Sequence, residues 1–167
     1  SHGRSRLILR HSLHPLIVSR KAGYAFLGYM KAQRQRLLGE RGNGGHGQPR
    51  RGLIEKYGFD TKFACHMLRL GHQGIELMQT GAFTLPIAEP KRTWLRDVRE
   101  GKITLQECLT VAGEQEDEIK NLLDVSPLPE VPNYAAIEEW MVNIYFRKWS
   151  AVKALEDRKN VPEMHHV

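Results

Sequence analysis

The feature that most constrains the fold of this chain is the helical spacing of apolar residues between Asp60 and Gly81. Residues 61 to about 79 contain no proline, aspartate is a favoured helix N-cap, and glycine is typical of the position that ends a helix. Within this segment seven residues form one apolar stripe: Phe63, Ala64, Met67, Leu68, Gly71, Ile75 and Met78. The stripe predicts a well-defined amphipathic helix. Because glycine is unfavourable inside helices, Gly71 and Gly74 also predict that another backbone packs closely there.

Four other segments show helical periodicity together with start or stop signals. They run over roughly residues 20–38, 90–100, 105–124 and 134–156. Ser19 is the expected N-cap of the first segment, and Thr104 with Glu107 forms a capping box ahead of the third. The segment 83–87 contains a proline and is at most one short extended segment. We therefore predict an all-α fold, an irregular bundle of about five helices with a glycine-rich loop.

We expect the first and last of these helices to bury one face each. In the first helix the expected inward residues are Ala22, Ala25, Phe26, Tyr29, Met30, Gln33 and Leu37. In the last helix they are Ile137, Trp140, Met141, Ile144, Tyr145 and Trp149.

The expected organisation is a single helical domain over residues 19–157. An N-terminal arm over 1–18 precedes it and a C-terminal tail over 158–167 follows it. Inside the domain, the glycine-rich stretch 39–52 predicts a flexible basic loop, and 125–132 is a stiff proline-rich connector.

Charge is distributed unevenly along the chain. Residues 1–73 carry 14 lysines and arginines against only Glu40, Glu55 and Asp60, whereas residues 74–167 carry 11 basic and 16 acidic residues. A strongly basic segment attracts polyanions and phosphates through its long-range field. The alternative is a solvated basic surface with no specific partner.

The helix after Asp60 carries a second, polar stripe. Lys62, His66, Arg69 and Gln73 follow the spacing i, i+4, i+7, i+11 and therefore share one face. Arginine binds phosphate oxygens in bidentate fashion, lysine acts as a point charge, and histidine donates a hydrogen bond. With the nearby Tyr57, this stripe predicts a phosphate- or nucleotide-binding site; the alternative is a solvated face that only helps packing.

A wider basic surface is predicted to bind nucleic acid. Its expected residues are Arg20, Tyr24, Lys31 and Arg34 on the first helix, and Arg50 and Arg51 at the end of the glycine-rich loop. No helix-turn-helix, RNP or KH signature accompanies them.

Several classes of protein and site are disfavoured. No apolar run is long enough to span a membrane, no signal peptide is recognisable, and two cysteines do not make a disulfide scaffold, so we expect a cytoplasmic protein that does not act at a membrane. Cys65 and Cys108 are expected to be small buried residues. The histidines and cysteines lack metal-ligand spacing, and no hydrolase or P-loop motif is present.

The run from Tyr57 to Leu70, YGFDTKFACHMLRL, resembles a signature of predicted nucleotidyltransferases of the DNA polymerase beta superfamily, a family found in bacteria and phages. Residues 19–22 and 26–33 resemble the helix ahead of that motif. Residues 76–81 resemble the element that follows it, and residues 126–132 its S-P-L-P-x-x-P connector. The similarity covers roughly residues 14–150.

This resemblance is to the helical C-terminal portion of the family. It implies that Tyr57, Lys62, His66 and Arg69 border a cleft facing a catalytic half, supplied in cis or in trans. That half would hold two Mg²⁺ ions through a D-x-D pair and a third carboxylate, and would use a nucleoside triphosphate. This sequence contains no D-x-D. We therefore expect no catalytic or metal-binding residue and no cofactor in this chain, which would be a fragment or a separately encoded helical module without activity alone.

Three functions are consistent with the sequence. The first is a nucleotidyltransferase C-terminal domain that contributes nucleotide- or nucleic-acid-phosphate binding. The second is a free-standing helical RNA- or DNA-binding protein. The third is a structural protein-interaction module that uses the tryptophan-rich last helix.

Overall fold

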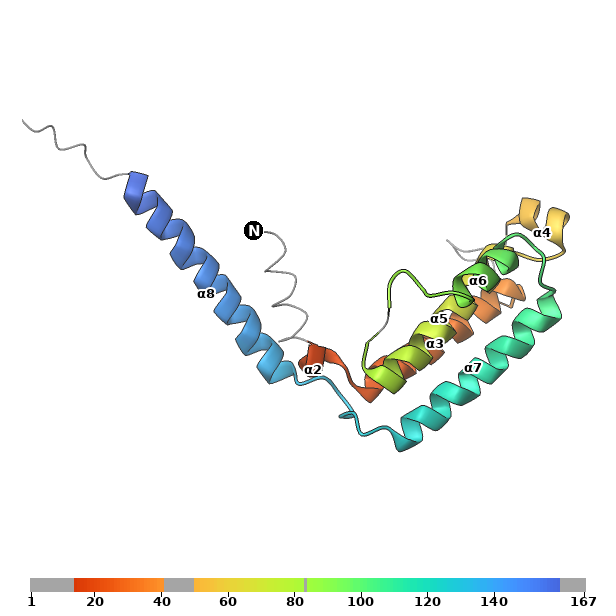
Figure 1. The fold of residues 1–167 in the computed structure, drawn as a ribbon, viewed down its shortest axis with the longest axis horizontal. Coiled ribbons are helices and arrows are strands. Elements are labelled where there is room, and N and C mark those ends of the chain that lie inside the picture. Colours follow the sequence, from red (N-terminus) through yellow and green to blue (C-terminus); the bar gives the residue numbers. More distant parts are fainter. Residues whose placement is uncertain (1–13, 41–49, 83, 160–167) are drawn as a thin grey trace, which may run out of the picture. The chain divides into compact units, whose positions relative to one another are not determined.

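A computed structural model describes residues 14–40, 50–82 and 84–159 of the 167-residue chain. These residues form helices and connecting segments without any strand, so the all-α prediction is confirmed (Figure 1). After the single turn α2 (His14–Ile17) come six longer helices, where about five were expected. They are α3 (Arg20–Leu37), α4 (Arg51–Tyr57), α5 (Thr61–Thr80), α6 (Lys91–Arg99), α7 (Leu105–Val125) and α8 (Tyr134–Lys159).

The helix that the sequence did not reveal is α4. Its seven residues are too few to establish an apolar period, and Gly52 in its first turn is typical of loops. Residues 51 and 52 of the predicted loop therefore belong to a helix. The rest of that loop over 41–49, most of the predicted arm and the end of the predicted tail lie outside the described residues.

The chain divides into two units. The 18–131 unit contains α3 to α7, and the terminal unit comprises residues 1–17 and 132–167, with α2 and α8. The expected single domain over 19–157 therefore crosses the boundary between them.

The core of the 18–131 unit forms around α5, which packs against α3, α4, α6 and α7 (Figure 1). The predicted stripe of α5 is buried throughout except at Ile75, which is half-buried. Met67 and Leu68 are completely buried, as are Met30 of α3, Val98 of α6 and Ile119 of α7. Burial of side chains of this size contributes about 1.5–3 kcal/mol each.

The two glycines inside α5 make room for side chains rather than for the backbone that we expected. A Cβ atom at Gly74 would lie 2.9 Å from Cδ1 of Ile119 and 3.0 Å from Cβ of Phe26. At Gly71 it would lie 2.8 Å from Cε of Met30. The glycines therefore let α3 and α7 approach α5 from two sides.

Most predicted helix ends are confirmed. Oδ1 of Asp60 accepts hydrogen bonds from the amides of Lys62 and Phe63, and Gly81 ends α5 with a φ of +73°. Thr104 and Glu107 form the predicted capping box of α7.

Ser19 occupies the N-cap position of α3 but does not cap with its side chain. Its buried hydroxyl has no hydrogen-bond partner among the described residues. Instead, the carbonyls of Pro129 and Glu130 accept hydrogen bonds of 2.8 and 3.0 Å from the amides of Arg20 and Lys21. The proline-rich connector thus satisfies first-turn amides that a local cap was expected to serve.

Two predictions of burial were wrong. On α3, Ala25 and Tyr29 are exposed, because the face turned to the core is centred on Gly23, Met30 and Leu37. On α8, four of the six residues expected to face inward are exposed: Met141, Ile144, Tyr145 and Trp149. The helix belongs to the terminal unit, where the single turn α2 packs against it and covers little surface. Ile137 and Trp140 are half-buried.

Among the described helices, none combines the length and the apolar character that a membrane-spanning segment needs.

Candidate anion-binding site

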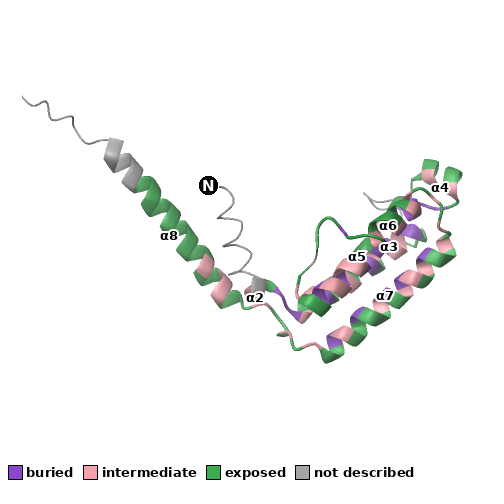
Figure 2. Cartoon of the chain, in the orientation of Figure 1, coloured by how far each residue is buried: buried purple, intermediate pink, exposed green. Residues whose placement is uncertain are grey.

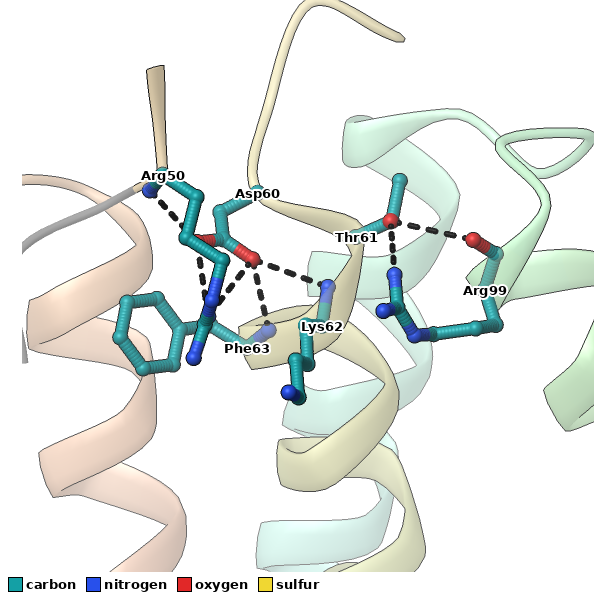
Figure 3. A network of polar contacts seen from close by, with 6 residues as sticks. All are labelled: Arg50, Asp60, Thr61, Lys62, Phe63 and Arg99. Atoms are coloured by element: carbon teal, nitrogen blue, oxygen red, sulfur yellow. Dashed lines mark hydrogen bonds and ion pairs between the residues drawn. The ribbon is translucent and has the colours of Figure 1, made fainter. Parts of the chain in front are cut away.

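The first turn of α5 is held by a network of polar contacts centred on the buried carboxylate of Asp60 (Figure 3). Besides capping α5, this carboxylate accepts a hydrogen bond of 2.8 Å from the amide of Arg50 and pairs with its guanidinium at 3.1 Å. The guanidinium also lies 5.1 Å from the centre of the Phe63 ring. Arg50 is therefore fixed against the N-terminus of α5 by one carboxylate and one aromatic face.

Beside this network lies a cavity of about 300 Å³, at the lower end of the range for small-molecule sites. Its lining comes from α3, the segment before α4, α5 and the last residue of α6. We call it the cationic cavity. It is lined by Gln33, Arg50, Lys62, Phe63, Cys65, His66, Arg69 and Arg99. The lining includes four lysine and arginine side chains and, among the described residues, no carboxylate.

Arg99 enters the cavity lining from the C-terminal end of α6 and is anchored to α5. Its Nη1 donates a hydrogen bond of 3.0 Å to Oγ1 of Thr61, whose hydroxyl in turn donates to the Arg99 carbonyl at 3.1 Å (Figure 3). Thr61 is fully buried. This reciprocal pair holds the guanidinium in place without neutralising its charge.

The imidazole of His66 is oriented by Arg69. Nη2 of Arg69 lies 2.9 Å from Nδ1 of His66, and because a guanidinium only donates, Nδ1 must be the acceptor. The ring proton of the neutral imidazole is then on Nε2, which can donate to a ligand. Burial, together with the charges of Arg69 and Arg36, lowers the pKa of His66 below its ordinary value of 6.5. The ring is therefore neutral at pH 7.

Cys65 lines the same cavity as a protonated thiol. Burial raises its pKa above 9.0, although Arg69 and Arg99 act in the opposite direction. Its Sγ donates a weak hydrogen bond of 3.5 Å to the Leu95 carbonyl. Cys65 is half-buried rather than buried, whereas Cys108 is fully buried, with a pKa raised to about 11 mainly by burial. Neither thiol has the low pKa of a reactive nucleophile.

A second cavity, of about 420 Å³, adjoins the cationic cavity and shares Cys65, Arg69 and Arg99 with it. Gln73 lines this adjoining cavity together with the apolar side chains of Leu85, Ile87 and Leu95. Two further arginines, Arg92 and Arg96, also line it, so this cavity is cationic as well. The predicted stripe is therefore divided: Lys62, His66 and Arg69 meet in one cavity, and Gln73 faces the next.

Tyr57 does not line either of these cavities. Its ring packs against Gly101, where an added Cβ atom would lie 2.8 Å from Cε1 of the ring, and Nζ of Lys56 lies 4.9 Å from the ring centre. In this structure Tyr57 fixes the turn between α6 and α7 against the end of α4.

The predicted nucleic-acid-binding residues are dispersed. Arg50 lines the cationic cavity, whereas Arg51 is exposed at the start of α4 and does not line it. Arg34 is paired across the helices with Glu116 of α7 at 3.3 Å. Tyr24 and Lys31 are exposed on α3.

Arg20 is placed differently from these residues. Its Nε atom is buried and has no hydrogen-bond partner among the described residues. Of the six predicted residues, only Arg50 lines the cationic cavity.

Two lining residues outside α5 were missed by sequence reasoning. Arg99 is 37 residues from Lys62 in sequence and belongs to a different helix, so no local spacing connects them. Gln33 was assigned to the buried stripe of α3, and it is indeed buried, with 8% exposure, but it also reaches the cavity. Only the packing of α3 and α6 on α5 brings both residues to the site.

A larger cavity of about 570 Å³, with α5, α6 and α7 in its walls, has the opposite electrostatic character. It is lined by four glutamates, Glu76, Glu89, Glu114 and Glu118, with Lys91 and His72 as its basic groups. Anion binding is therefore favoured only on the side of α5 that carries Lys62 and Arg69.

Within the parts of the chain that the structure describes, no group of three histidine, cysteine, aspartate or glutamate side chains is placed to hold a metal ion. Comparison of the chain with protein-family models, with curated proteins and with solved structures gives no match.

Proposed function

We propose that this chain is a helical module that binds phosphate groups of a nucleotide or nucleic acid in the cationic cavity. The observation that carries this proposal is the convergence of Arg50, Lys62, Arg69 and Arg99 on one cavity whose lining contains no described carboxylate. Since the buried Asp60 compensates Arg50, the charges of Lys62, Arg69 and Arg99 remain to attract an anion.

The arrangement suits phosphate oxygens in particular. Arg69 and Arg99 supply planar donor groups, Lys62 is an exposed ammonium group, and Nε2 of His66 supplies a neutral donor. Two of these groups are preorganised by contacts with neighbours, Arg99 through Thr61 and His66 through Arg69. Preorganisation lowers the entropic cost of binding.

Within this proposal, the chain is the C-terminal helical portion of a nucleotidyltransferase of the DNA polymerase beta superfamily. The support is the Tyr57–Leu70 motif, whose Lys62, His66 and Arg69 line the cavity. Tyr57, which the resemblance also implies in the cleft, packs on Gly101 instead.

Metal-dependent transfer would need residues from elsewhere. The described residues include no cluster suited to Mg²⁺, and the sequence has no D-x-D pair. The proposal therefore assigns to this chain the binding and orientation of phosphates, and no catalytic step.

The test is isothermal titration calorimetry with ATP, performed on the unaltered chain and on the variant Lys62→Ala/Arg69→Ala. We expect affinity to fall by about 100-fold, since each lost charge-assisted hydrogen bond is worth about 1.5 kcal/mol. The variant Lys120→Ala/Arg147→Ala removes the same charge at exposed positions outside the cavity and should change affinity little. Equal affinity for both double variants would remove the cavity from the proposal.

The same titration with a single-stranded oligonucleotide separates a nucleotide site from a free-standing nucleic-acid-binding protein. The basic character of residues 1–73 favours this second candidate. A steep fall of log affinity with log salt concentration, reporting many phosphate contacts, would support it. Shallow dependence with retained ATP binding would support a site for one nucleotide.

A further inference from the structure

The helix α8, in the terminal unit, carries an exposed apolar surface that is independent of the proposed anion site. Six large apolar side chains between residues 141 and 152 of this helix are between 46% and 75% exposed: Met141, Val142, Tyr145, Phe146, Trp149 and Val152. Figure 2 shows α8 as exposed along most of its described length. Exposed apolar surface of this extent marks a contact surface rather than a solvated one.

These six residues lie on one side of the helix. Their spacing is i, i+1, i+4, i+5, i+8 and i+11, and at about 100° per residue they form a single stripe, which we call the α8 face. The half-buried residues of α8, which are Ala136, Ile137 and Trp140, lie on the opposite side of the helix. Among the described residues, the α8 face is therefore distinct from the side of the helix that is half-buried.

Opposite charges bracket the α8 face. Glu138 lies on the same side one turn before Met141 and Val142, and Lys153 lies on it directly after Val152. Both residues are exposed. With a rise of about 1.5 Å per residue, they are about 22 Å apart along the helix. The surface is thus acidic at one end, apolar in the middle and basic at the other end.

We propose that the α8 face binds the α8 face of a second copy of this chain in antiparallel orientation. A two-fold axis between Tyr145 and Phe146 brings Glu138 of each copy opposite Lys153 of the other, and Val142 opposite Trp149. A parallel pair would instead place like charges together at both ends. Because the pattern is complementary to itself only when reversed, it specifies both the occupant and its direction.

Sedimentation equilibrium of the whole chain tests the oligomeric state. We expect twice the chain mass of 19.2 kDa, and a return to the monomer mass in Trp149→Glu. Circular dichroism should show that the variant retains the helices of the 18–131 unit. A wild-type chain that stays monomeric at about 100 µM, or that binds anionic lipid vesicles as a monomer, would overturn the proposal.

Charge reversal tests the orientation. Glu138→Lys and Lys153→Glu should each weaken dimerisation by about tenfold, since each change replaces two attractive pairs by two repulsive ones. The double variant Glu138→Lys/Lys153→Glu should restore the affinity. Dimerisation that is unaffected by all three changes, or that is lost without rescue, would contradict the antiparallel pairing.

Discussion

The two long helices α5 and α8 have similar patterns and opposite environments. Each helix is longer than five turns and presents a stripe of apolar residues at helical spacing. Along α5 these side chains are the core of the 18–131 unit, and Met67 and Leu68 are fully buried. On α8 Trp149 is 75% exposed, and Figure 2 shows most of the described length of this helix as exposed. An apolar stripe therefore predicts that a face is to be covered, without specifying whether the same chain covers it.

The two helices also differ in their glycines. Gln115 and Met30 approach Gly71 of α5 closely, and Ile119 and Phe26 approach Gly74, whereas α8 contains no glycine between residues 134 and 159. A glycine inside a helix has a cost of about 1 kcal/mol relative to alanine. Close packing accounts for this cost at Gly71 and Gly74, whereas an added Cβ at Gly28 of α3 or Gly113 of α7 would meet no described atom within 4 Å. Tight contacts at a glycine, rather than glycine content or an apolar stripe alone, therefore distinguish α5 from α8.

The largest difference between the helices should appear when a methionine is truncated in each. Met67→Ala in α5 should lower the free energy of unfolding of the 18–131 unit by about 2–5 kcal/mol, because a fully buried side chain leaves a cavity. Met141→Ala in α8 is the matched control, and it should change that free energy by less than about 0.5 kcal/mol. Urea titration followed by circular dichroism gives both values. Similar losses in the two variants would mean that α8 is part of the same cooperative core.

The N-terminus of α5 should be more sensitive to loss of its cap than that of α7. Asp60→Ala should destabilise the 18–131 unit by about 2–4 kcal/mol, because the carboxylate serves two first-turn amides as well as the amide and guanidinium of Arg50. The exposed cap Thr104 serves only its own turn, and Thr104→Ala should cost about 1 kcal/mol. Thermal unfolding of the two variants measures the difference. A cap at Asp60 worth no more than the one at Thr104 would show that the Arg50 contacts add nothing.

Adding one methyl group at Gly74 tests whether close packing explains why this position is a glycine. Gly74→Ala should destabilise the unit by about 1–2 kcal/mol, because the clashes with Ile119 and Phe26 exceed the gain in helix propensity. Gly113→Ala in α7 meets no described atom within 4 Å and should stabilise by up to about 1 kcal/mol. Urea titration of both variants should therefore give changes of opposite sign. A stabilising Gly74→Ala would refute close packing as the reason for this glycine.

The features that could be predicted from the sequence are those that depend on contacts between residues close together in the chain. Asp60 and Gly81 bound α5 through contacts in a single turn, and Thr104 finds Glu107 three residues away. The stripe of Lys62, His66 and Arg69 is likewise local to one helix, and its members do meet in one cavity.

The parts that the sequence did not predict depend on contacts over longer distances. Arg99 reaches the cavity only because α6 packs on α5, and the amides that Ser19 was expected to cap are served by a connector more than 100 residues later in the chain. The apolar face of α8 is exposed because this helix belongs to the terminal unit and not to the 18–131 unit that contains the core. No periodicity within a helix contains that information.

The smallest expected effect is a change of stability with pH that arises from histidine. It should occur in the α5 region, which contains His66 and His72, and not in α8, which contains no histidine. Burial lowers the pKa of His66, so the unfolded chain takes up its proton first as the pH falls below 6.5. Stability of the 18–131 unit should therefore be unaffected above pH 6.5 and should decrease below it, until the lowered pKa is passed. His66→Gln should remove part of this decrease, and His72→Gln should remove a further part, because burial also lowers the pKa of His72.

Protonation of His66 should lower the stability of the fold but raise its affinity for an anion, and only His66 should have this second effect. A bound anion favours the protonated imidazole, so sulfate, which does not titrate in this range, should bind more tightly as the pH falls from 7 to 5. In His66→Gln the affinity for sulfate should be nearly independent of pH, whereas in His72→Gln it should follow the wild type, because His72 lines the acidic cavity. Titration calorimetry at three pH values measures this. Since an imidazole outside the site would lower stability in acid without tightening sulfate binding, the two pH profiles together distinguish a histidine that contacts the ligand from one that is only buried.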